Sequence, residues 1–490
     1  MEENTANELL AVRRHKMEAL RAAGLDPFGA KYDVTSGPGE TRASFVEGRP
    51  VRTAGRVTAH RNMGKSHFLD LSDQSGRMQV YLNAKEVGPE AAALFDHVDI
   101  GDFLGVEGSC FTTKTGEPSI KATSFTVLSK ALRPLPDKWH GVQDTEIKYR
   151  QRYLDLIANP ESLGIFQKRI AIVREIRRFL EDRGFVEVET PMMQVVPGGA
   201  AAQPFRTHHN ALGVDLFLRI APELFLKRML VGGFPKIFEL NRNFRNEGIS
   251  RRHNPEFTML EAYQAFADFE EMASLVEEMV CHLAATICGG LMIEHKDAEG
   301  AVVRTIDLTR PWRRERYADL ISDAIPGWND LDSVARRTKC NELGLDISHC
   351  TEDFEVTQHV FEKLVEEKTI NPLFVTHCPK ELVPLAKQNT DDPSVVDVYE
   401  LVINGQEISP GYSELNDPDV QRARLEQQSG GETQKIDEDF LKALEYGMPP
   451  AGGIGIGIDR LVMMLTGAES IRDVILFPHM RPRAAMPAAE

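Results

Sequence analysis

The sequence contains no long apolar run and no paired cysteine motif. Its six cysteines are scattered along 490 residues, and none belongs to a Cys-x-x-Cys pair. This spacing argues against a disulfide framework and a structural zinc site, and it fits reduced thiols in a cytoplasm. No apolar stretch is long enough to cross a bilayer, and the N-terminal residues lack the apolar core of an export signal. We therefore expect a cytoplasmic protein with no membrane association.

A positive net charge is also missing. The chain has 74 acidic and 57 basic residues, for a formal charge of −17. This balance gives no overall attraction to nucleic acid, but it leaves room for local basic patches, because salt screens distant charges. The hydrophobic content of 42% and the charged content of 27% are ordinary for a globular protein with a large core. At this length, two or three domains are expected.

The composition changes along the chain and predicts four regions. Residues 1–50 begin as a mixed-charge helix and continue as a loop. Residues 51–130 contain several short strands separated by glycine turns, which predicts a small antiparallel β-barrel. Residues 131–150 include two prolines near a strand end and are expected to form a linker. In residues 151–490, helices and antiparallel strands mix without β-α-β alternation, which predicts an α+β domain.

A cluster of charge precedes a strand-like run in FRNEGISRRHNPEFTMLEAY, residues 244–263. Period-2 alternation in that run places Phe257, Met259, Glu261 and Tyr263 on one face of a strand. The stretch before it, KIFELNRNFRNE, alternates in the same way, with Arg245 on its polar face. Two such strands joined by a short loop would form a polar shelf over an apolar core. An ordinary solvated hairpin is the alternative for this stretch alone.

The predicted barrel has aromatic side chains on its outer face. Leu69, Leu71 and Val80 fall on the apolar side of their strands, so Phe68 and Tyr81 fall on the other side together with Gln79. Aromatic rings beside hydrogen-bonding side chains on a barrel surface suit base stacking and readout of base edges. The alternative is that these rings pack under a neighbouring domain.

Two carboxylates come together at a second predicted hairpin. VYELVINGQEISPGYSELND, residues 398–417, contains Asn404-Gly405, a strong signal for a tight hairpin turn. With that turn, Glu400 and Glu407 lie on the same face, one diagonal step apart. Two acidic oxygen donors, completed by substrate phosphates, form a typical Mg²⁺ site. A pair of exposed strand acids is the alternative.

The glycine-rich stretch AGGIGIGIDRLVMM, residues 451–464, is followed by no β-α-β unit, so a dinucleotide-binding motif is a weak interpretation. A glycine strand that lets its backbone approach a ligand or a facing element fits better. It is predicted to lead into a short helix capped by Asp459 and ended near Gly467, with Arg460 projecting from the first turn. A plain packing role for the glycines remains the alternative.

These segments together resemble a class II aminoacyl-tRNA synthetase of the lysyl type, over nearly the whole chain. The three class motifs are identified in order as FLEDRGFVEVETPMM, FRNEGISRRHNPEFTMLEAY and GIGIGIDR. The resemblance implies an OB-fold anticodon-binding barrel and a catalytic domain built on an antiparallel sheet with flanking helices. It also implies ATP-dependent transfer of L-lysine to tRNA(Lys), Mg²⁺ on the ATP phosphates, and a homodimer, because the first motif builds the subunit interface in this class.

The resemblance implies roles for several residues of the second and third motifs. Arg245 would hold the α-phosphate of ATP and the carboxylate of the amino acid, and adenine would stack between Phe257 and Arg460. Arg245 and Arg460 are thus the expected catalytic residues, and no general base is nominated. Glu400 and Glu407 would carry Mg²⁺. The remaining nucleotide contacts are expected from Glu247, His253 and Asn254.

The resemblance also implies which residues bind the amino acid and which read the anticodon. Glu261 and Glu414 would bind the ε-ammonium of lysine, with Tyr263 as a hydrogen-bonding partner, since an unpaired buried charge is very costly. Glu223, with Gly199, would bind the α-amino group. The residues expected to read the uridine-rich lysine anticodon lie on the barrel: Phe68, Gln79 and Glu117.

The chain departs from the family pattern at two positions. Pro410 stands where the family usually has asparagine, and it has neither a side-chain amide nor a backbone N–H. The usual extra contact to the amino-acid carboxylate is therefore not carried over. Gln203 replaces a frequent arginine.

Three other functions are weighed against the leading one. A ligase that lysylates a protein, such as elongation factor P, would lack the N-terminal barrel. A catalytically silent nucleic-acid-binding or regulatory protein on this scaffold would have lost the motif arginines or the metal carboxylates. An aspartyl- or asparaginyl-type enzyme shares the fold, but its pocket would carry arginine where this chain has glutamate.

Overall fold

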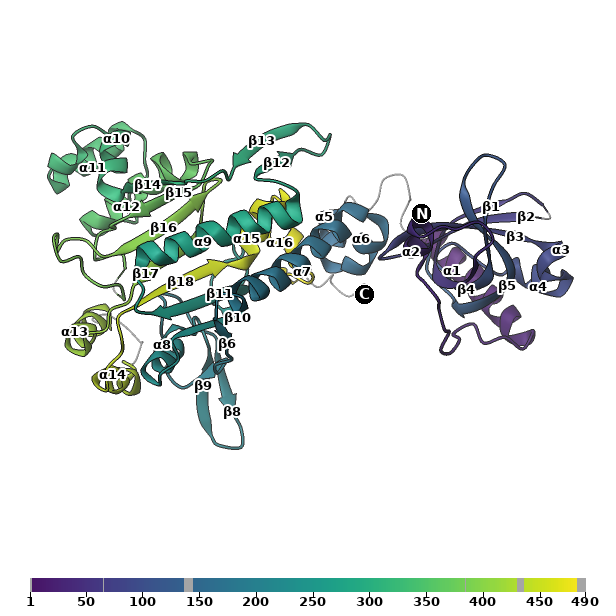
Figure 1. Cartoon of the computed structure of the whole chain (residues 1–490), viewed down its shortest axis with the longest axis horizontal. Helices are drawn as coiled ribbons and strands as arrows, with labels where there is room; N and C mark the ends of the chain where they lie inside the picture. The colour runs from purple at the N-terminus through teal and green to yellow at the C-terminus, as the bar shows by residue number, and fades with distance from the viewer. Residues whose placement is uncertain (1, 65, 136–143, 384, 430–435, 483–490) are drawn as a thin grey trace, which may run out of the picture. The chain divides into compact units, whose positions relative to one another are not determined.

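The computed structural model describes residues 2–64, 66–135, 144–383, 385–429 and 436–482. The chain divides into two compact units, Met1–Leu163 and Gly164–Glu490, which we describe separately (Figure 1). The linker expected over 131–150 lies partly outside the described residues; its last residues form helix α5 (Thr145–Arg150). None of the helices in the described ranges is long and apolar enough to span a membrane.

The first unit contains a closed five-stranded barrel with the order β1-β2-β3-β5-β4, which confirms the predicted barrel. Its strands do not all pair antiparallel as predicted, because β3 and β5, which close the sheet, are parallel. Leucine, valine and isoleucine side chains from alternate strand positions fill its interior, as the period-2 pattern required. Its strands are β1 (Pro50–Asn62), β2 (Ser66–Asp73), β3 (Gly76–Asn83), β4 (Phe103–Thr112) and β5 (Pro118–Ser129). The other helices that begin in this unit are α1 (Glu2–Ala22), α2 (Pro38–Ala43), α3 (Ala84–Val87), α4 (Pro89–Phe95), α6 (Arg152–Ala158) and α7 (Pro160–Glu181).

An eight-stranded sheet forms the centre of the second unit. Its order is β14-β15-β16-β17-β18-β11-β10-β6. The six strands from β15 to β10 pair antiparallel, as expected, but both edge pairs are parallel, so the sheet as a whole is mixed. The strands are β6 (Val186–Glu187), β10 (Lys236–Phe244), β11 (Glu256–Ala265), β14 (Arg313–Arg316), β15 (Leu373–Thr376), β16 (Val398–Ile403), β17 (Gln406–Ser413) and β18 (Ala451–Gly457).

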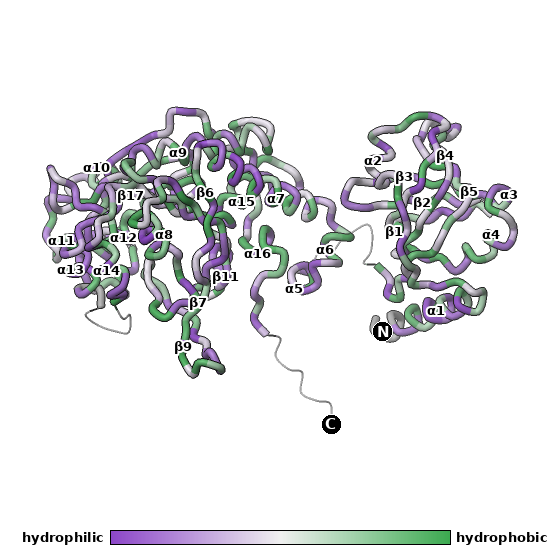
Figure 2. Tube along the Cα trace, turned by 60° about the horizontal axis from the view of Figure 1, so that its bottom comes forward, coloured by the Kyte–Doolittle hydropathy of each residue, from purple (hydrophilic) through white to green (hydrophobic). Residues whose placement is uncertain are grey.

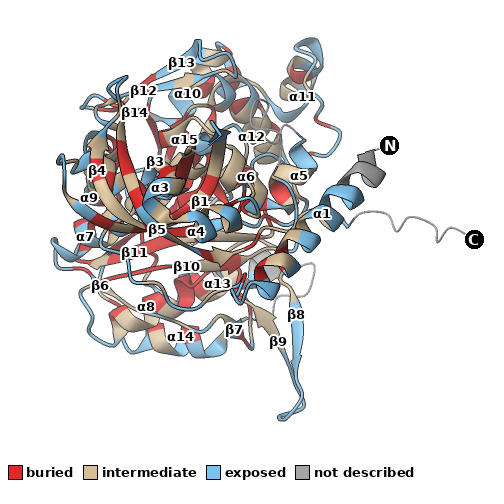
Figure 3. Ribbon diagram, turned by 90° about the vertical axis from the view of Figure 1, so that its right-hand side faces the viewer, coloured by how far each residue is buried: buried red, intermediate tan, exposed pale blue. Residues whose placement is uncertain are grey.

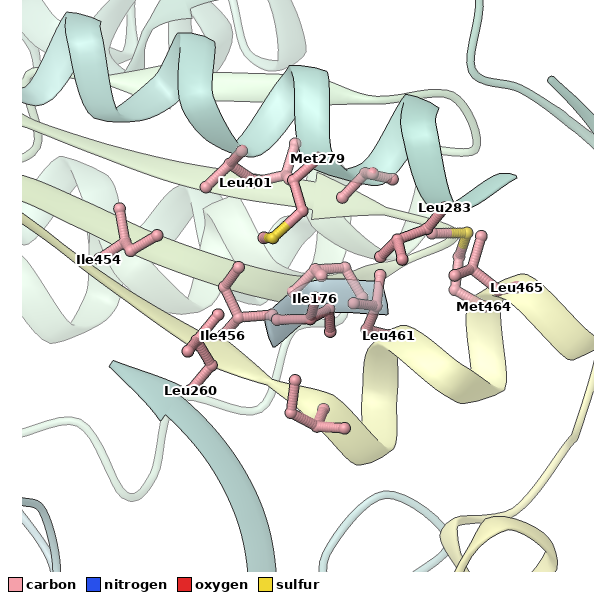
Figure 4. Close-up of a cluster of buried hydrophobic side chains, with 14 of the residues drawn as sticks. Ile176, Leu260, Met279, Leu283, Leu401, Ile454, Ile456, Leu461, Met464 and Leu465 are labelled. Atoms are coloured by element: carbon pink, nitrogen blue, oxygen red, sulfur yellow. The ribbon is translucent and has the colours of Figure 1, made fainter. Parts of the chain in front are cut away.

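The main core lies between one face of this sheet and the helices α7, α9 (Phe269–Leu283) and α15 (Ile458–Thr466) (Figure 1). Helix α7 contributes Ile176 to this core, and apolar and polar residues both occur along α7, as expected of a helix with one buried face (Figure 2). Figure 4 shows Leu260, Ile454 and Ile456 from the sheet facing Met279 of α9. This packing fixes the strands whose opposite face carries the polar residues.

Two further apolar clusters pack helices of this unit against the sheet outside the main core. One packs α10 and α12 against β15 and β16, and the other packs α8 and α14 against β10 and β11. Buried residues concentrate along the central strands, whereas the β8 hairpin strand is exposed (Figure 3). The remaining elements are β7 (Met193–Gln194), β8 (Arg206–His209), β9 (Val214–Leu218), α8 (Glu223–Val231), β12 (Met292–Lys296), β13 (Val302–Asp307), α10 (Tyr317–Ala324), α11 (Ser333–Glu342), α12 (Asp353–Leu364), α13 (Pro418–Ser429), α14 (Glu438–Glu445) and α16 (Ile471–Val474), with single turns at Ala284–Cys288, Trp328–Asp330 and Glu366–Lys368.

Candidate active site

The strands β10 and β11 form the predicted polar shelf. In their register, Glu239 lies opposite Glu261. Leu260 and Ala262 belong to the main core, so the alternating residues of the same strand point to the other face. On its second edge, β11 pairs with the glycine strand β18, which places Gly455 opposite Glu261. The alternation read from the sequence is therefore confirmed, and the simple solvated hairpin is wrong, because Glu261 is only 4% exposed.

Arg245 lies directly after β10 and is anchored through its backbone, whose N–H donates to the carbonyl of Pro255 at 2.8 Å. Its guanidinium carbon lies 5.1 Å from the ring centre of Phe257. The buried Nε of Arg245 has no hydrogen-bond partner among the described residues. Burial lowers the pKa of Arg245, although the carboxylates of Glu247 and Glu261 oppose this shift. An enclosed guanidinium with an unused donor is suited to an anionic ligand.

Arg460 joins three segments that are far apart in the sequence. Its Nη1 donates to the carbonyl oxygen of Glu407, and its Nη2 donates to His253 Nε2, both at 3.0 Å. The other ring nitrogen, His253 Nδ1, lies 2.9 Å from Ser250 Oγ. Burial and the nearby Arg460 lower the pKa of His253, so the imidazole is neutral at pH 7. The loop after β10, the strand β17 and the helix α15 therefore meet at one point.

Asp459 does not cap α15, so the sequence-based expectation is wrong. The cap position is held by Gly457, and the Asp459 side chain points elsewhere. Its Oδ1 accepts from Arg169 Nη1 at 2.6 Å, and its Oδ2 accepts from the backbone N–H of Thr258 at 2.8 Å. A charged pair that is almost buried therefore ties α7 and β11 to the first turn of α15, which holds Arg460 in place.

The residues of these segments line a cavity of about 230 Å³. Asn254 is buried beside it and donates from Nδ2 to the carbonyl of Glu256 at 2.6 Å. Gln203 is one of the two departures from the family pattern. Its backbone carbonyl accepts at 2.7 Å from the N–H of Asn246, which lies in the loop after β10. The cavity brings together most residues expected to contact the nucleotide: Arg245, Glu247, His253, Asn254, Phe257, Glu407 and Arg460, with Pro410 also in the lining.

The second hairpin turns at Asn404-Gly405 as predicted, with Val402 opposite Glu407. A bulge in β17 then shifts the register by one residue, so that Glu400 lies opposite Pro410 instead of Ser409. Burial, and then the negative charge of Glu407, raise the pKa of Glu400 to about 8. A nearby cation would relieve this repulsion. No group of three or more His, Cys, Asp or Glu side chains in the described ranges could hold a metal ion, so substrate oxygens would have to complete the site.

The pocket predicted for lysine is represented by three buried carboxylates that interact with one another, those of Glu223, Glu261 and Glu414. Tyr263 donates from its hydroxyl to Glu261 Oε2 at 3.1 Å. Burial, and then the charge of Glu223, raise the pKa of Glu261 well above its ordinary value. Gly199, at a φ of 86°, lies against Glu223, since a Cβ there would be 3.0 Å from the Glu223 Cβ. The structure thus brings all predicted members of this pocket together.

Two members of this pocket were not predicted from the sequence. Tyr412 donates to Glu223 Oε2 at 3.3 Å. Lys227 is completely buried, and its Nζ lies 2.7 Å from Glu223 Oε1 and 2.5 Å from Glu414 Oε2. The i,i+4 spacing of glutamate and lysine in the helical stretch ELFLK was the available signal. Glu414 Oε1, by contrast, has no hydrogen-bond partner among the described residues.

Two of the predicted barrel residues lie on strands β2 and β3, and Glu117 directly precedes β5. Phe68 pairs with Tyr81, with ring centres 5.1 Å apart, and both are half-buried. Gln79 is 8% exposed and accepts from Ser119 Oγ at 2.9 Å, so it is less open to solvent than its alternating position suggested. Glu117 is bound by Arg42 Nη1 at 2.7 Å.

Comparisons with known proteins agree with this architecture. Residues 144–481 match the family described as tRNA synthetases class II (D, K and N), and residues 51–128 match the OB-fold nucleic acid binding domain. The lysine–tRNA ligase of Pelotomaculum thermopropionicum is 50% identical over 98% of this chain and 96% of its own length. That of Bacillus subtilis is 46% identical over 97% of this chain and 98% of its own length. The chain therefore belongs to the lysine–tRNA ligase family of class II tRNA synthetases.

Proposed function

We propose that the chain activates L-lysine with ATP and transfers the lysyl group to the 3′ end of tRNA(Lys) in the cytoplasm. The single observation that carries the choice of amino acid is the pocket of three buried carboxylates, Glu223, Glu261 and Glu414. Such a pocket selects a ligand with two positive groups, because Lys227 supplies one compensating charge and the other two carboxylate charges still need a partner. Charging of tRNA(Lys) with labelled lysine tests the complete reaction, and the absence of charging would contradict it.

The nucleotide is assigned to the cavity beside Arg245. Adenine stacks between Phe257 and Arg460, while the remaining polar residues of the loop hold the ribose and phosphates. Arg245 lines this cavity and also interacts electrostatically with Glu261 of the carboxylate pocket. It can therefore hold the α-phosphate and the carboxylate of lysine next to each other. Positioning of this kind supplies much of the catalysis in phosphoryl-group chemistry.

The reaction needs little covalent chemistry from the protein. A carboxylate oxygen of lysine forms a bond to the α-phosphorus, and the bond from that phosphorus to the β-phosphate oxygen breaks, which releases pyrophosphate. Arg245 and Arg460 stabilise the negative charge that develops. A ribose hydroxyl of the tRNA then attacks the lysyl carbonyl, AMP leaves with the carboxyl oxygen, and the hydroxyl proton is released.

We assign Mg²⁺ to Glu400 and Glu407, where it would neutralise the ATP phosphates. The raised pKa of Glu400 supports this assignment, because two carboxylates that repel each other favour a shared cation. Glu407→Gln is expected to raise the Mg²⁺ concentration needed for half-maximal pyrophosphate exchange about tenfold. Glu367→Gln, at an exposed glutamate paired with Lys363, is the control. An unchanged Mg²⁺ dependence in Glu407→Gln would contradict the assignment.

Gly453 provides a steric test of the lysine pocket. A Cβ at this position would lie 1.9 Å from Glu414 Oε1 and 2.7 Å from Tyr263 Cε1, so the carboxylate would have to move. We expect Gly453→Ala to raise the KM for lysine about tenfold or more, with the KM for ATP unchanged. In Gly164→Ala the new Cβ meets nothing within 4 Å, and both constants should stay the same. A parallel loss of ATP and lysine binding would argue against the assigned pocket.

The barrel is proposed to read the anticodon through Phe68, Gln79 and Glu117. The Phe68–Tyr81 pair supports this proposal, since half-buried rings on a barrel face can stack on bases. Phe68→Ala should raise the KM for tRNA about tenfold, as expected for one lost stacking contact, and leave tRNA-independent pyrophosphate exchange intact. Phe103→Ala, at an aromatic on β4 that lies under Arg56, is the matched control. A change in tRNA-independent pyrophosphate exchange by Phe68→Ala would show that Phe68 has a structural role and would contradict the proposal.

We also propose that the chain acts as a homodimer. The first motif and the residues on either side of it expose several apolar side chains, which a second copy would cover: Ile170, Val186, Met193 and Val195. Sedimentation should show the mass of two chains, and a monomer at micromolar concentration would contradict the proposal.

A further inference from the structure

Lys227 places a positive charge inside the carboxylate pocket. It lies on α8, one turn after Glu223, and reaches across to Glu414 just beyond β17. Its side chain is completely inaccessible to solvent. Burial by itself would lower the pKa of Lys227, but the charges of Glu223 and Glu414 outweigh this effect, so the pKa is raised. Lys227 is therefore a permanent cation in a pocket otherwise assigned to a cationic substrate.

The charged groups near Lys227 set the charge of the pocket. When ionised, the carboxylates of Glu223, Glu261 and Glu414 contribute three negative charges, while Arg245, which also interacts with Glu261, is assigned to the carboxylate of the substrate. Arg219 and Glu239 form a fully buried pair at 2.6 Å and cancel each other. Two buried phenols, Tyr263 and Tyr412, stay neutral, since burial and then the neighbouring carboxylates raise the pKa of each well above its ordinary value. With the three carboxylates ionised, they and Lys227 together carry a charge of −2; without Lys227, the charge would be −3.

We propose that Lys227 is a positioning residue that determines specificity, because it leaves two uncompensated negative charges for a substrate with two ammonium groups. The proposal rests on the proposed function. Lys227 binds one oxygen of Glu223 and one of Glu414. The second oxygen of Glu414 has no partner among the described residues, and the second oxygen of Glu223 accepts from Tyr412 and keeps a lone pair for the substrate. An amino acid with a neutral side chain leaves one buried carboxylate without a partner, which is strongly unfavourable. Lys227 contacts no reacting atom and acts only through the two glutamates.

The same arrangement sets the proton state of Glu414. Burial raises the pKa of Glu414 to about 8 even though Lys227 opposes the shift. Removal of Lys227 takes away the nearest positive charge, so this pKa must rise further. A protonated carboxyl group does not attract an ammonium group, and binding of lysine then requires loss of a proton. In a variant without Lys227, lysine binding should therefore weaken most below pH 8 and recover at higher pH.

The test compares the KM for lysine in the full-length chain and in Lys227→Met between pH 6.5 and pH 9.5, by pyrophosphate exchange. Methionine has a similar length and no charge. We expect the KM of the variant to exceed that of the unsubstituted chain at least about tenfold at pH 7, because each unit by which the pKa of Glu414 rises reduces its ionised fraction about tenfold. The ratio of the two KM values should fall towards one above pH 9, and the KM for ATP should not change.

Lys130→Met is the matched control. Lys130 is equally buried and is also held by two carboxylates, Asp99 and Asp102, but it lies in the barrel unit. This variant should lose stability without any pH-dependent change in lysine KM. Lys227→Gln, which keeps hydrogen-bond donors but has no charge, replaces the methionine variant if that variant does not fold.

The outcomes separate this inference from the proposed function. Lysine-dependent exchange by the unsubstituted chain tests the proposed function alone. If that exchange is present and the KM ratio for Lys227→Met is the same at every pH, Lys227 has only a structural role and the inference is wrong. A ratio that declines with rising pH, together with an unchanged ratio for Lys130→Met, supports it.

Discussion

Arg245→Ala is expected to lower kcat/KM for lysine-dependent pyrophosphate exchange about 10³-fold or more. The guanidinium is enclosed, has an unused buried Nε donor and is coupled to the charged groups of both pockets. Its loss removes the cation that we assign to both reacting anions. Arg245→Lys keeps the charge but loses the planar fork, and should still cost about 10²-fold.

The control for Arg245 lies in the same loop. Arg251 is exposed and does not line the cavity, so Arg251→Gln should change exchange by no more than about twofold. Single-turnover kinetics with lysine and ATP separate binding from chemistry. If Arg245→Ala retains the rate of adenylate formation at saturating substrates, Arg245 only binds, and its assignment as a catalytic residue is wrong.

Glu261→Gln is expected to raise the KM for lysine about 10²-fold or more, with the KM for ATP within about twofold of the original. Glutamine has the same shape and can still accept from Tyr263, but it cannot compensate a buried ammonium. Because the KM for ATP is measured in the same protein, it reports on misfolding.

Glu256 offers a matched control on the same strand. It lies at the open end of β11, where its Oε1 is 3.8 Å from Arg242 Nε, and its pairing is partly exposed. Glu256→Gln should change neither KM by more than about twofold. An equal loss of lysine and ATP use in Glu261→Gln would remove Glu261 from the ammonium site and leave it a general structural role.

Local patterns predicted the strand-based parts of the site. The alternation through Glu261 and Tyr263 fixed which side chains face away from the core, because one face of a half-buried strand must be apolar. The Asn404-Gly405 pair predicted the turn between β16 and β17, since both residues adopt a positive φ there, of 56° and 69°. The order of the class motifs predicted the family.

Contacts between distant segments could not be predicted in this way. Asp459 looked like a helix cap because its partner, Arg169, precedes it by 290 residues. The bulge in β17 shifts Glu400 by one pairing position, and no local residue announces it. The burial of Gln79 depends on β5, which pairs with β3 only when the barrel closes. Each miss comes from tertiary packing rather than from a misread local pattern.

Lys227 illustrates the same limit. Its spacing from Glu223 is visible in the sequence, but such pairs on helices usually lie on the surface and contribute little. Only the packing of α8 against the sheet makes the pair buried and brings Glu414 to it. The charge of the pocket is thus a property of the fold, and we infer that this charge determines the choice of substrate.

Exchange of labelled pyrophosphate into ATP, with each amino acid supplied in turn and no tRNA present, shows directly which amino acid the pocket accepts. We expect exchange with lysine alone, because only lysine brings two ammonium groups to the pocket of Glu223, Glu261 and Glu414. Exchange with a different amino acid would contradict the assigned specificity, and the absence of exchange with every amino acid would contradict the proposed enzyme.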